Sequence, residues 1–199
     1  AQAGVRYSIT NPEQYIKTNI NGFYNILQLS KIYKIDHLIY ASSSSVYGNN
    51  KRFPLKEIYN TDSPLSLYAS SKKCNETLAY SYSNIFKIPT TGLRFFTVYG
   101  PYGRPDMALF KFVKNIILDK PIKLFNAGNH FRDFTYIDNV IDPIYKLLRK
   151  KSKDKIPFQI FNIANGKSIN LKTFLNLIEK ELSKKALVKN LKMQIGDVK

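Results

Sequence analysis

The sequence predicts an α/β fold built on a parallel sheet, and the order of its strands and helices carries this prediction. Two apolar runs, "HLIYAS" and "TTGLRFFTVYG", are typical of buried strands, and a helical pattern from about Leu67 to Phe86 stands between them. Strand, helix and strand at this spacing indicate a βαβ crossover, which makes the two strands parallel. A later apolar run, "PFQIFNIAN", supplies a further strand.

The remaining elements follow from periodicity and breakers. A helical pattern opens at Asn11-Pro12 and runs to about Lys34. A long loop through Phe53-Pro54 and Ser63-Pro64 precedes the helix at 67–86, which we expect to stop near Pro89. "AQAGVRYS" is typical of the exit from a strand, so we expect an internal fragment. Beyond the second strand we expect, in order, a loop "GPYGRPD", a helix "MALFKFVKNIIL", a strand "PIKLF", a helix that develops within "TYIDNVIDPIYKLLRK", the strand "PFQIFNIAN" and a helix "NLKTFLNLIEKEL".

Composition indicates a globular protein with a core. The chain has 199 residues, of which 44% are hydrophobic. No apolar stretch approaches the length of a membrane span and no signal peptide pattern opens the chain, so we expect no membrane partner. The single cysteine, Cys74, cannot form an internal disulfide, and a reducing cytoplasm is the expected location.

The net charge of +17 raises the alternative of a non-catalytic, basic nucleic-acid-binding protein. The lysines that supply most of this charge are scattered, apart from a short cluster at 149–155, and frequent Asn and Ile indicate compositional drift. No recognised nucleic-acid motif is present, so we expect no nucleic-acid partner. The alternative would show binding that weakens steeply with salt and that does not depend on Tyr68.

Tyr68 and Lys72 are candidates for proton transfer. They stand four residues apart on the predicted helix and therefore share one face. An ammonium beside a phenol favours the phenolate, which can exchange a proton with a substrate hydroxyl. The serines of "YASSSSVYG" stand at the carboxyl end of a strand, where open parallel sheets bind ligands, and Ser43 precedes Tyr68 by 25 residues.

This combination resembles the extended short-chain dehydrogenase/reductases, specifically the nucleotide-sugar epimerases and dehydratases. The resemblance rests on "SSSSVYG" followed by "YASSK". It extends through "AQAGVR", "TNINGFYNIL", "LRFFTVYGPYGRPDMALFKF", "RDFTYIDNV" and "MQIGDV", which are similar to the UDP-glucuronate 4-epimerases of capsule biosynthesis. It implies an NAD-binding, Rossmann-type doubly wound parallel sheet whose first strands and Gly-rich phosphate loop would precede this chain. It also implies a smaller, incomplete C-terminal region that binds the sugar nucleotide.

The resemblance also implies a role for each site residue. Ser43, Tyr68 and Lys72 would be catalytic, with Tyr68 the acid/base on the sugar 4-hydroxyl and Lys72 also holding the nicotinamide ribose. Asn19 and Ser42 would lie beside NAD. Arg132 would hold the diphosphate of the UDP-sugar and Phe125 would contact the uracil. Simpler interpretations stay open: Asn19 on a helix face, Arg132 paired with Asp133 or Asp138, and Phe125 in the core.

Ser44 and Ser45 bear on the choice of sugar. Related dehydratases and decarboxylases carry acidic residues at these places, which assist elimination or further proton transfer. Hydroxyls can instead donate to a substrate carboxylate, so Ser44 and Ser45, with Thr97 and Arg104 by resemblance, would hold the carboxylate of a hexuronic acid. Arg6 would add positive charge. The expected reaction is NAD-dependent epimerisation at carbon 4 of UDP-glucuronate; another nucleotide-sugar epimerase or a UDP-glucuronate decarboxylase is the alternative.

The domain boundaries are expected as follows. Residues 1–105 would form the C-terminal part of the NAD-binding domain, and residues 106–199 a substrate-binding region interleaved with returning Rossmann elements at about 134–165. Because the phosphate loop is absent, we expect residues 1–199 alone to bind NAD weakly. By resemblance, the full-length protein would be a homodimer formed through the helices at 11–34 and 67–86.

Overall fold

The computed structural model describes residues 1–192, so the expected "MQIGDV" segment lies outside the described residues. The chain separates into two compact units, and each is described by itself. Unit 1 comprises residues 1–96 and 141–163, and unit 2 comprises residues 97–140 with the chain from Ala164 onward.

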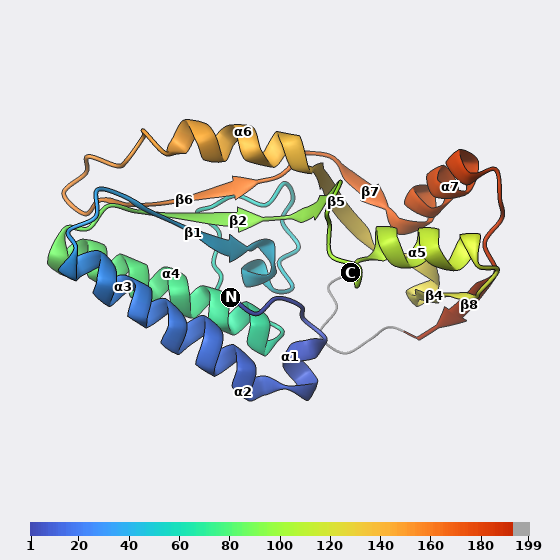
Figure 1. The fold of residues 1–199 in the computed structure, drawn as a ribbon, viewed down its shortest axis with the longest axis horizontal. Coiled ribbons are helices and arrows are strands. Elements are labelled where there is room, and N and C mark those ends of the chain that lie inside the picture. Colours follow the sequence, from blue (N-terminus) through green and yellow to red (C-terminus); the bar gives the residue numbers. More distant parts are fainter. Residues whose placement is uncertain (193–199) are drawn as a thin grey trace. The chain divides into compact units, whose positions relative to one another are not determined.

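Unit 1 contains a parallel sheet of strands β1 (Leu38–Ser43), β2 (Thr90–Phe95) and β6 (Phe158–Ile163), in the order β1-β2-β6. Helix α4 (Leu67–Phe86) links β1 to β2, which confirms the predicted crossover and parallel sheet (Figure 1). The Ser66 side chain caps α4 by accepting from the Ala69 N–H, and Lys87 ends it in the left-handed conformation. In register, Ser43 of β1 lies opposite Phe95 of β2.

The helical pattern predicted for residues 11–34 is a run of helical segments. These are α2 (Pro12–Tyr15), a π-helical segment (Ile16–Asn21) and α3 (Gly22–Ile32). Ahead of them, a short helix, α1 (Tyr7–Thr10), begins within the "AQAGVRYS" segment. Helices α3 and α4 run side by side along one face of the sheet, and α6 (Ile137–Leu147) runs along the other (Figure 1).

Unit 2 contains two small sheets. Strands β3 (Thr97–Tyr99) and β5 (Phe131–Tyr136) pair in parallel, and β7 (Ser168–Asn170) pairs with β5 in antiparallel fashion. Strand β4 (Ile122–Phe125) pairs in parallel with β8 (Val188–Leu191). The prediction of a single strand through "TTGLRFFTVYG" is wrong: the chain passes from β2 in unit 1 to β3 in unit 2 at Phe96. Apolar character continues through this change of sheet, so periodicity does not reveal it.

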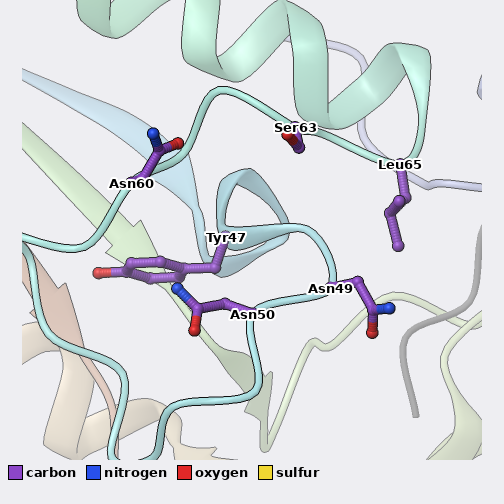
Figure 2. A pocket seen from close by; sticks show the side chains of 6 residues that line it. All are labelled: Tyr47, Asn49, Asn50, Asn60, Ser63 and Leu65. Carbon is purple, nitrogen blue, oxygen red and sulfur yellow. The ribbon is translucent and has the colours of Figure 1, made fainter.

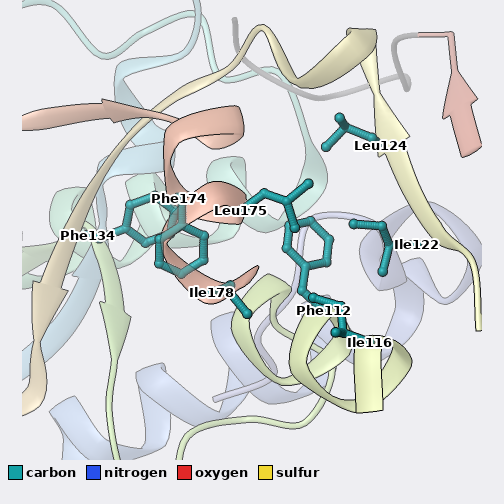
Figure 3. Packing of buried hydrophobic residues seen from close by; sticks show 8 residues of the cluster. All are labelled: Phe112, Ile116, Ile122, Leu124, Phe134, Phe174, Leu175 and Ile178. Carbon is teal, nitrogen blue, oxygen red and sulfur yellow. The ribbon is translucent and has the colours of Figure 1, made fainter. Parts of the chain in front are cut away.

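The core of unit 2 is apolar. Helices α5 (Ala108–Ile117) and α7 (Leu171–Leu182) pack their hydrophobic faces together with β4 and β5 (Figure 3). Phe134 and Phe174 stack with their ring centroids 4.0 Å apart and an interplanar angle of 8°. The buried cluster consists of Phe112, Ile116, Ile122, Leu124, Phe134, Phe174, Leu175 and Ile178.

Candidate active site

Strand β1 ends in the serine run, and the serines divide between strand and turn. Ser42 and Ser43 are the last, buried residues of β1, whereas Ser44 and Ser45 are half-buried in a 3₁₀ turn, Ser44–Tyr47. The Ser43 Oγ accepts from the Ser45 N–H at 3.2 Å and so caps this turn. A strand that changes directly into a capped turn holds its final hydroxyls in defined positions.

Tyr68 and Lys72 lie one turn apart on α4, as predicted. The Lys72 Nζ donates to the Ala41 carbonyl oxygen of β1 at 2.8 Å, two residues before Ser43. Lys72 is only 4% exposed, and this burial lowers the pKa of its ammonium to about 8. The half-buried Tyr68 ring packs edge-on against Tyr15, with the centroids 6.2 Å apart. The lysine therefore ties the helix face that carries Tyr68 to the strand that carries Ser43.

Asn19 is buried within the π-helical segment, a geometry that often occurs at functional sites. Its Oδ1 accepts from the Gln2 N–H at 2.6 Å, and its Nδ2 donates to the Gln2 carbonyl and to the Ser71 Oγ, both at 2.9 Å. The Tyr15 hydroxyl lies 2.6 Å from the Gly4 carbonyl, to which it donates. Asn19 and Tyr15 thus hold residues 2–4 against the π-helical segment, α4 and α2.

The carboxyl end of the parallel sheet also holds a buried ion pair, which the sequence analysis did not predict. Glu76 and Arg94 are each 3% exposed, and Arg94 donates from Nε and from Nη2 to the two carboxylate oxygens at 2.9 Å. Ser42 Oγ donates to the Glu76 Oε1 at 2.6 Å. Burial on its own lowers the pKa of Arg94, but the bonds to Glu76 and its charge outweigh this and raise it. Two signals point to the pair: Glu76 continues the four-residue spacing of Tyr68 and Lys72, and Arg94 interrupts an apolar strand.

The ion pair extends to the 3₁₀ turn. The guanidinium carbon of Arg94 lies 4.7 Å from the centroid of the Tyr47 ring, and the Tyr47 hydroxyl donates to the Asn162 Oδ1 of β6 at 2.7 Å. Tyr47 also lines a small pocket of about 220 Å³ beside the turn, which Figure 2 shows. Its lining residues are Tyr47, Asn49, Asn50, Asn60, Ser63 and Leu65.

The other site candidates belong to unit 2, apart from Arg6, which is exposed in unit 1. Thr97 lies in β3 opposite Phe134, and Phe125 in β4 opposite Leu191. Arg104 donates from Nε and Nη2 to the carboxylate of Asp106 and holds the pKa of that carboxyl below its usual range. Arg132 lies in β5, where its Nη1 donates to the Phe131 carbonyl at 2.8 Å. The structure therefore brings Asn19, Ser42–Ser45, Tyr68 and Lys72 together in unit 1.

Across residues 1–192, no group of three or more His, Cys, Asp or Glu residues could hold a metal ion. No helix in the described part of the chain is long and apolar enough to cross a bilayer.

Comparison with known proteins gives consistent matches. The "NAD dependent epimerase/dehydratase family" matches residues 1–164. Protein CapI of Staphylococcus aureus is 49% identical over the whole chain, and a probable UDP-glucuronate 4-epimerase of Rhizobium meliloti is 44% identical over the whole chain. The chain covers 64% and 62% of these two relatives, respectively. The crystal structure of a UDP-glucuronic acid 4-epimerase from Bacillus cereus, in complex with UDP-glucuronic acid and NAD, matches all of this chain over 62% of its own length, with 35% identity and a TM-score of 0.91.

Proposed function

The chain belongs to the NAD dependent epimerase/dehydratase family, and from this premise we propose that the whole protein interconverts UDP-glucuronate and UDP-galacturonate by epimerisation at carbon 4. The observation that carries the proposal is the Lys72–Ala41 bond, because it joins the Tyr68 face of α4 to the strand that ends at Ser43. NAD is the cofactor of this family. The chain spans about 60% of the curated relatives, so the activity is proposed for the full-length protein.

The donor set of unit 1 fits NAD. Within residues 1–192, Lys72 Nζ has one acceptor, the Ala41 carbonyl, although an ammonium has three donors. The two remaining donors suit the vicinal hydroxyls of a ribose. When bound, NAD supplies the acceptor for the hydride that leaves carbon 4 and the source of the hydride that returns.

The side chains of unit 1 supply the proton chemistry. Tyr68 Oη removes the proton of the sugar 4-hydroxyl, and the charge on Lys72 favours the phenolate that does so. The Ser43 hydroxyl shares the proton with Tyr68 and orients the sugar oxygen. Epimerisation requires the 4-keto sugar to turn before carbon 4 is reduced from its other face, after which Tyr68 returns the proton.

The sugar carboxylate is the proposed determinant of substrate choice. Ser44 and Ser45 place hydroxyls at the end of β1, and Thr97 and Arg104 are proposed to complete the site. Within residues 1–192, Arg104 shares Nε and Nη2 with Asp106, which leaves Nη1 to donate to a carboxylate. A fixed carboxylate also protects the 4-keto acid, since decarboxylation needs the carboxylate perpendicular to the carbonyl plane. Arg132 and Phe125 are proposed to bind the diphosphate and the uracil.

A substrate comparison tests the proposal. The full-length protein, loaded with NAD, is assayed side by side on UDP-glucuronate and UDP-glucose. We expect strong preference for UDP-glucuronate. UDP-glucose carries a neutral hydroxymethyl group in place of the carboxylate and would leave buried polar groups of the site unpaired, at a cost of about 1–3 kcal/mol each. The Tyr68→Phe variant should keep its fold and lose roughly 10²–10⁴-fold in turnover. Equal efficiency on the two sugars would contradict the carboxylate site, and full activity of Tyr68→Phe would contradict the assigned base.

The proposed assembly is a homodimer formed through α3 and α4. Helix α3 exposes large apolar side chains to solvent, among them Leu29 at 47% and Ile32 at 65%. Such a surface favours contact with another apolar surface. Sedimentation equilibrium of the full-length protein tests this, and a monomer at micromolar concentration would contradict it.

A further inference from the structure

Glu76 and Arg94 form a buried ion pair that has no part in the chemistry proposed above. Glu76 shares one face of α4 with Tyr68 and Lys72, at successive four-residue steps. Its carboxylate receives three short bonds, two from Arg94 and one from Ser42. All three of these side chains are at most 3% exposed. A buried carboxylate with this number of charge-assisted bonds has essentially one orientation.

The network connects several elements at the carboxyl end of the parallel sheet. Ser42 belongs to β1, Arg94 to β2 and Glu76 to α4. Arg94 Nη1 donates to the Glu57 carbonyl at 3.2 Å, in the long loop after the turn, and the Glu57 Oε1 accepts from the Asn162 N–H of β6 at 2.8 Å. Because Tyr47 contacts both Arg94 of β2 and Asn162 of β6, the 3₁₀ turn is tied to two strands of the sheet.

Ser42 also connects the network to the groups assigned to catalysis, because its two neighbours in the chain contact or belong to those groups. Ser42 follows Ala41, whose carbonyl receives Lys72, and precedes Ser43, whose Oγ caps the turn. The bond from Ser42 to Glu76 of α4 therefore also fixes Ala41 and Ser43 relative to this helix. A displacement of about 1 Å at a reacting group can lower turnover by about 100-fold.

We propose that Glu76 and Arg94 are positioning residues, which hold Ser43, the Ser44–Tyr47 turn and the carbonyl that receives Lys72 in register with the Tyr68 face of α4. Only the expected effect on catalysis rests on the proposed function. The geometric part concerns unit 1 alone, so it can be measured without substrate.

The test separates a displacement of the catalytic groups from a loss of folding stability. In the full-length protein, Glu76→Met with Arg94→Met removes both charges and replaces them with apolar side chains of similar length, so that no buried charge is left unpaired. Ser42→Ala removes the bond from β1 and leaves the ion pair in place. Since Ser42 is also expected beside NAD, this variant is measured by hydrogen exchange in the absence of NAD. Asp62→Asn is the matched control. It neutralises a carboxylate that forms an exposed ion pair with Lys73, which lies on α4 as Glu76 does.

Hydrogen exchange and steady-state kinetics are the two measurements. We expect the amides of residues 43–47 to exchange at least about tenfold faster in the double variant, while those of α7 in unit 2 keep their wild-type rates. At an unfolding midpoint close to that of wild type, kcat should fall about 100-fold with KM changed less than about threefold. Ser42→Ala should raise the exchange rates of residues 43–47 by about tenfold, and Asp62→Asn should shift neither measurement.

Three results would overturn the inference. One is wild-type exchange at residues 43–47 in both Ser42→Ala and the double variant. Another is a kcat of the double variant equal to that of wild type. A third is a double variant in which only KM is changed. If the double variant does not fold, the exchange rates of Ser42→Ala decide. If the wild-type protein epimerises no nucleotide sugar, the proposed function fails, and the exchange rates still decide whether the network holds the turn.

Discussion

Two buried regions of this molecule are stabilised in opposite ways. In unit 1, the carboxyl end of the sheet buries an ion pair, an ammonium and several hydroxyls, with Glu76, Arg94 and Lys72 each at most 4% exposed. In unit 2, the cluster around Phe134 and Phe174 consists of aliphatic and aromatic side chains. Hydrogen bonds and ion pairs depend on direction, whereas apolar burial depends mainly on area and volume. The polar region can therefore specify the position of a reacting group, and the apolar region contributes stability.

Removal of one partner from the ion pair should have the largest effect on stability. Glu76→Met leaves the Arg94 charge buried without a counter-ion, which costs about 3–5 kcal/mol. The double variant with Arg94→Met should recover most of this loss. Urea unfolding of the two variants and wild type measures both values. A single variant as stable as the double variant would contradict the account of a buried, paired charge.

A cavity in the apolar region should cost somewhat less and should leave catalysis unchanged. Leu124→Ala removes a side chain that is 4% exposed in the unit 2 cluster, with an expected loss of about 2–4 kcal/mol. We expect kcat at 25 °C to stay within about twofold of wild type. A fall in kcat comparable to that of the ion-pair double variant would remove the contrast between the two regions.

The pH dependence of stability tests the buried ammonium. Lys72 has a pKa of about 8 in the folded chain and a reference value of 10.5. Between these values the unfolded chain holds a proton that the folded chain has lost, so wild-type stability rises with pH in this interval. Relative to Lys72→Met, the wild type should gain roughly 1–3 kcal/mol from pH 8 to pH 10.5 and should show no change below pH 7. Unfolding of both proteins at several pH values measures this difference. A difference that stays constant with pH would show that Lys72 is not desolvated.

The smallest effect is expected at the exposed pair of Lys73 and Asp62, where N and O lie 3.5 Å apart and the Asp62 side chain is 70% exposed. Asp62→Asn should change the free energy of unfolding by less than about 1 kcal/mol, because solvent screens such pairs. Thermal unfolding at low and at high salt provides the measurement. An effect as large as that of Glu76→Met would mean that burial is not what separates the two ion pairs.

The sequence by itself predicts the parallel sheet, the crossover helix at 67–86 and the serine-ended strand. These features depend on local periodicity, on breakers such as Pro89, and on the four-residue spacing that puts Tyr68 and Lys72 on one face. Each is a property of neighbours in the chain, which a single sequence displays directly. The same reasoning predicts helices at α5 and α7 from their apolar stripes.

Only the tertiary structure decides what lies between distant segments. Phe96 marks a change from one sheet to another inside a segment that the sequence presents as a single strand, and strands β5, β7 and β8 depend on pairing partners far along the chain. Glu76 and Arg94 are 18 residues apart, and Tyr47 meets Asn162 across 115 residues. A charged residue in a helix or strand pattern can equally face solvent, and only the approach of its counter-ion distinguishes a buried pair from an exposed one. The residues that react can be recognised from local spacing, whereas those that hold them in place become visible only when the sheet, the helix and the turn have come together.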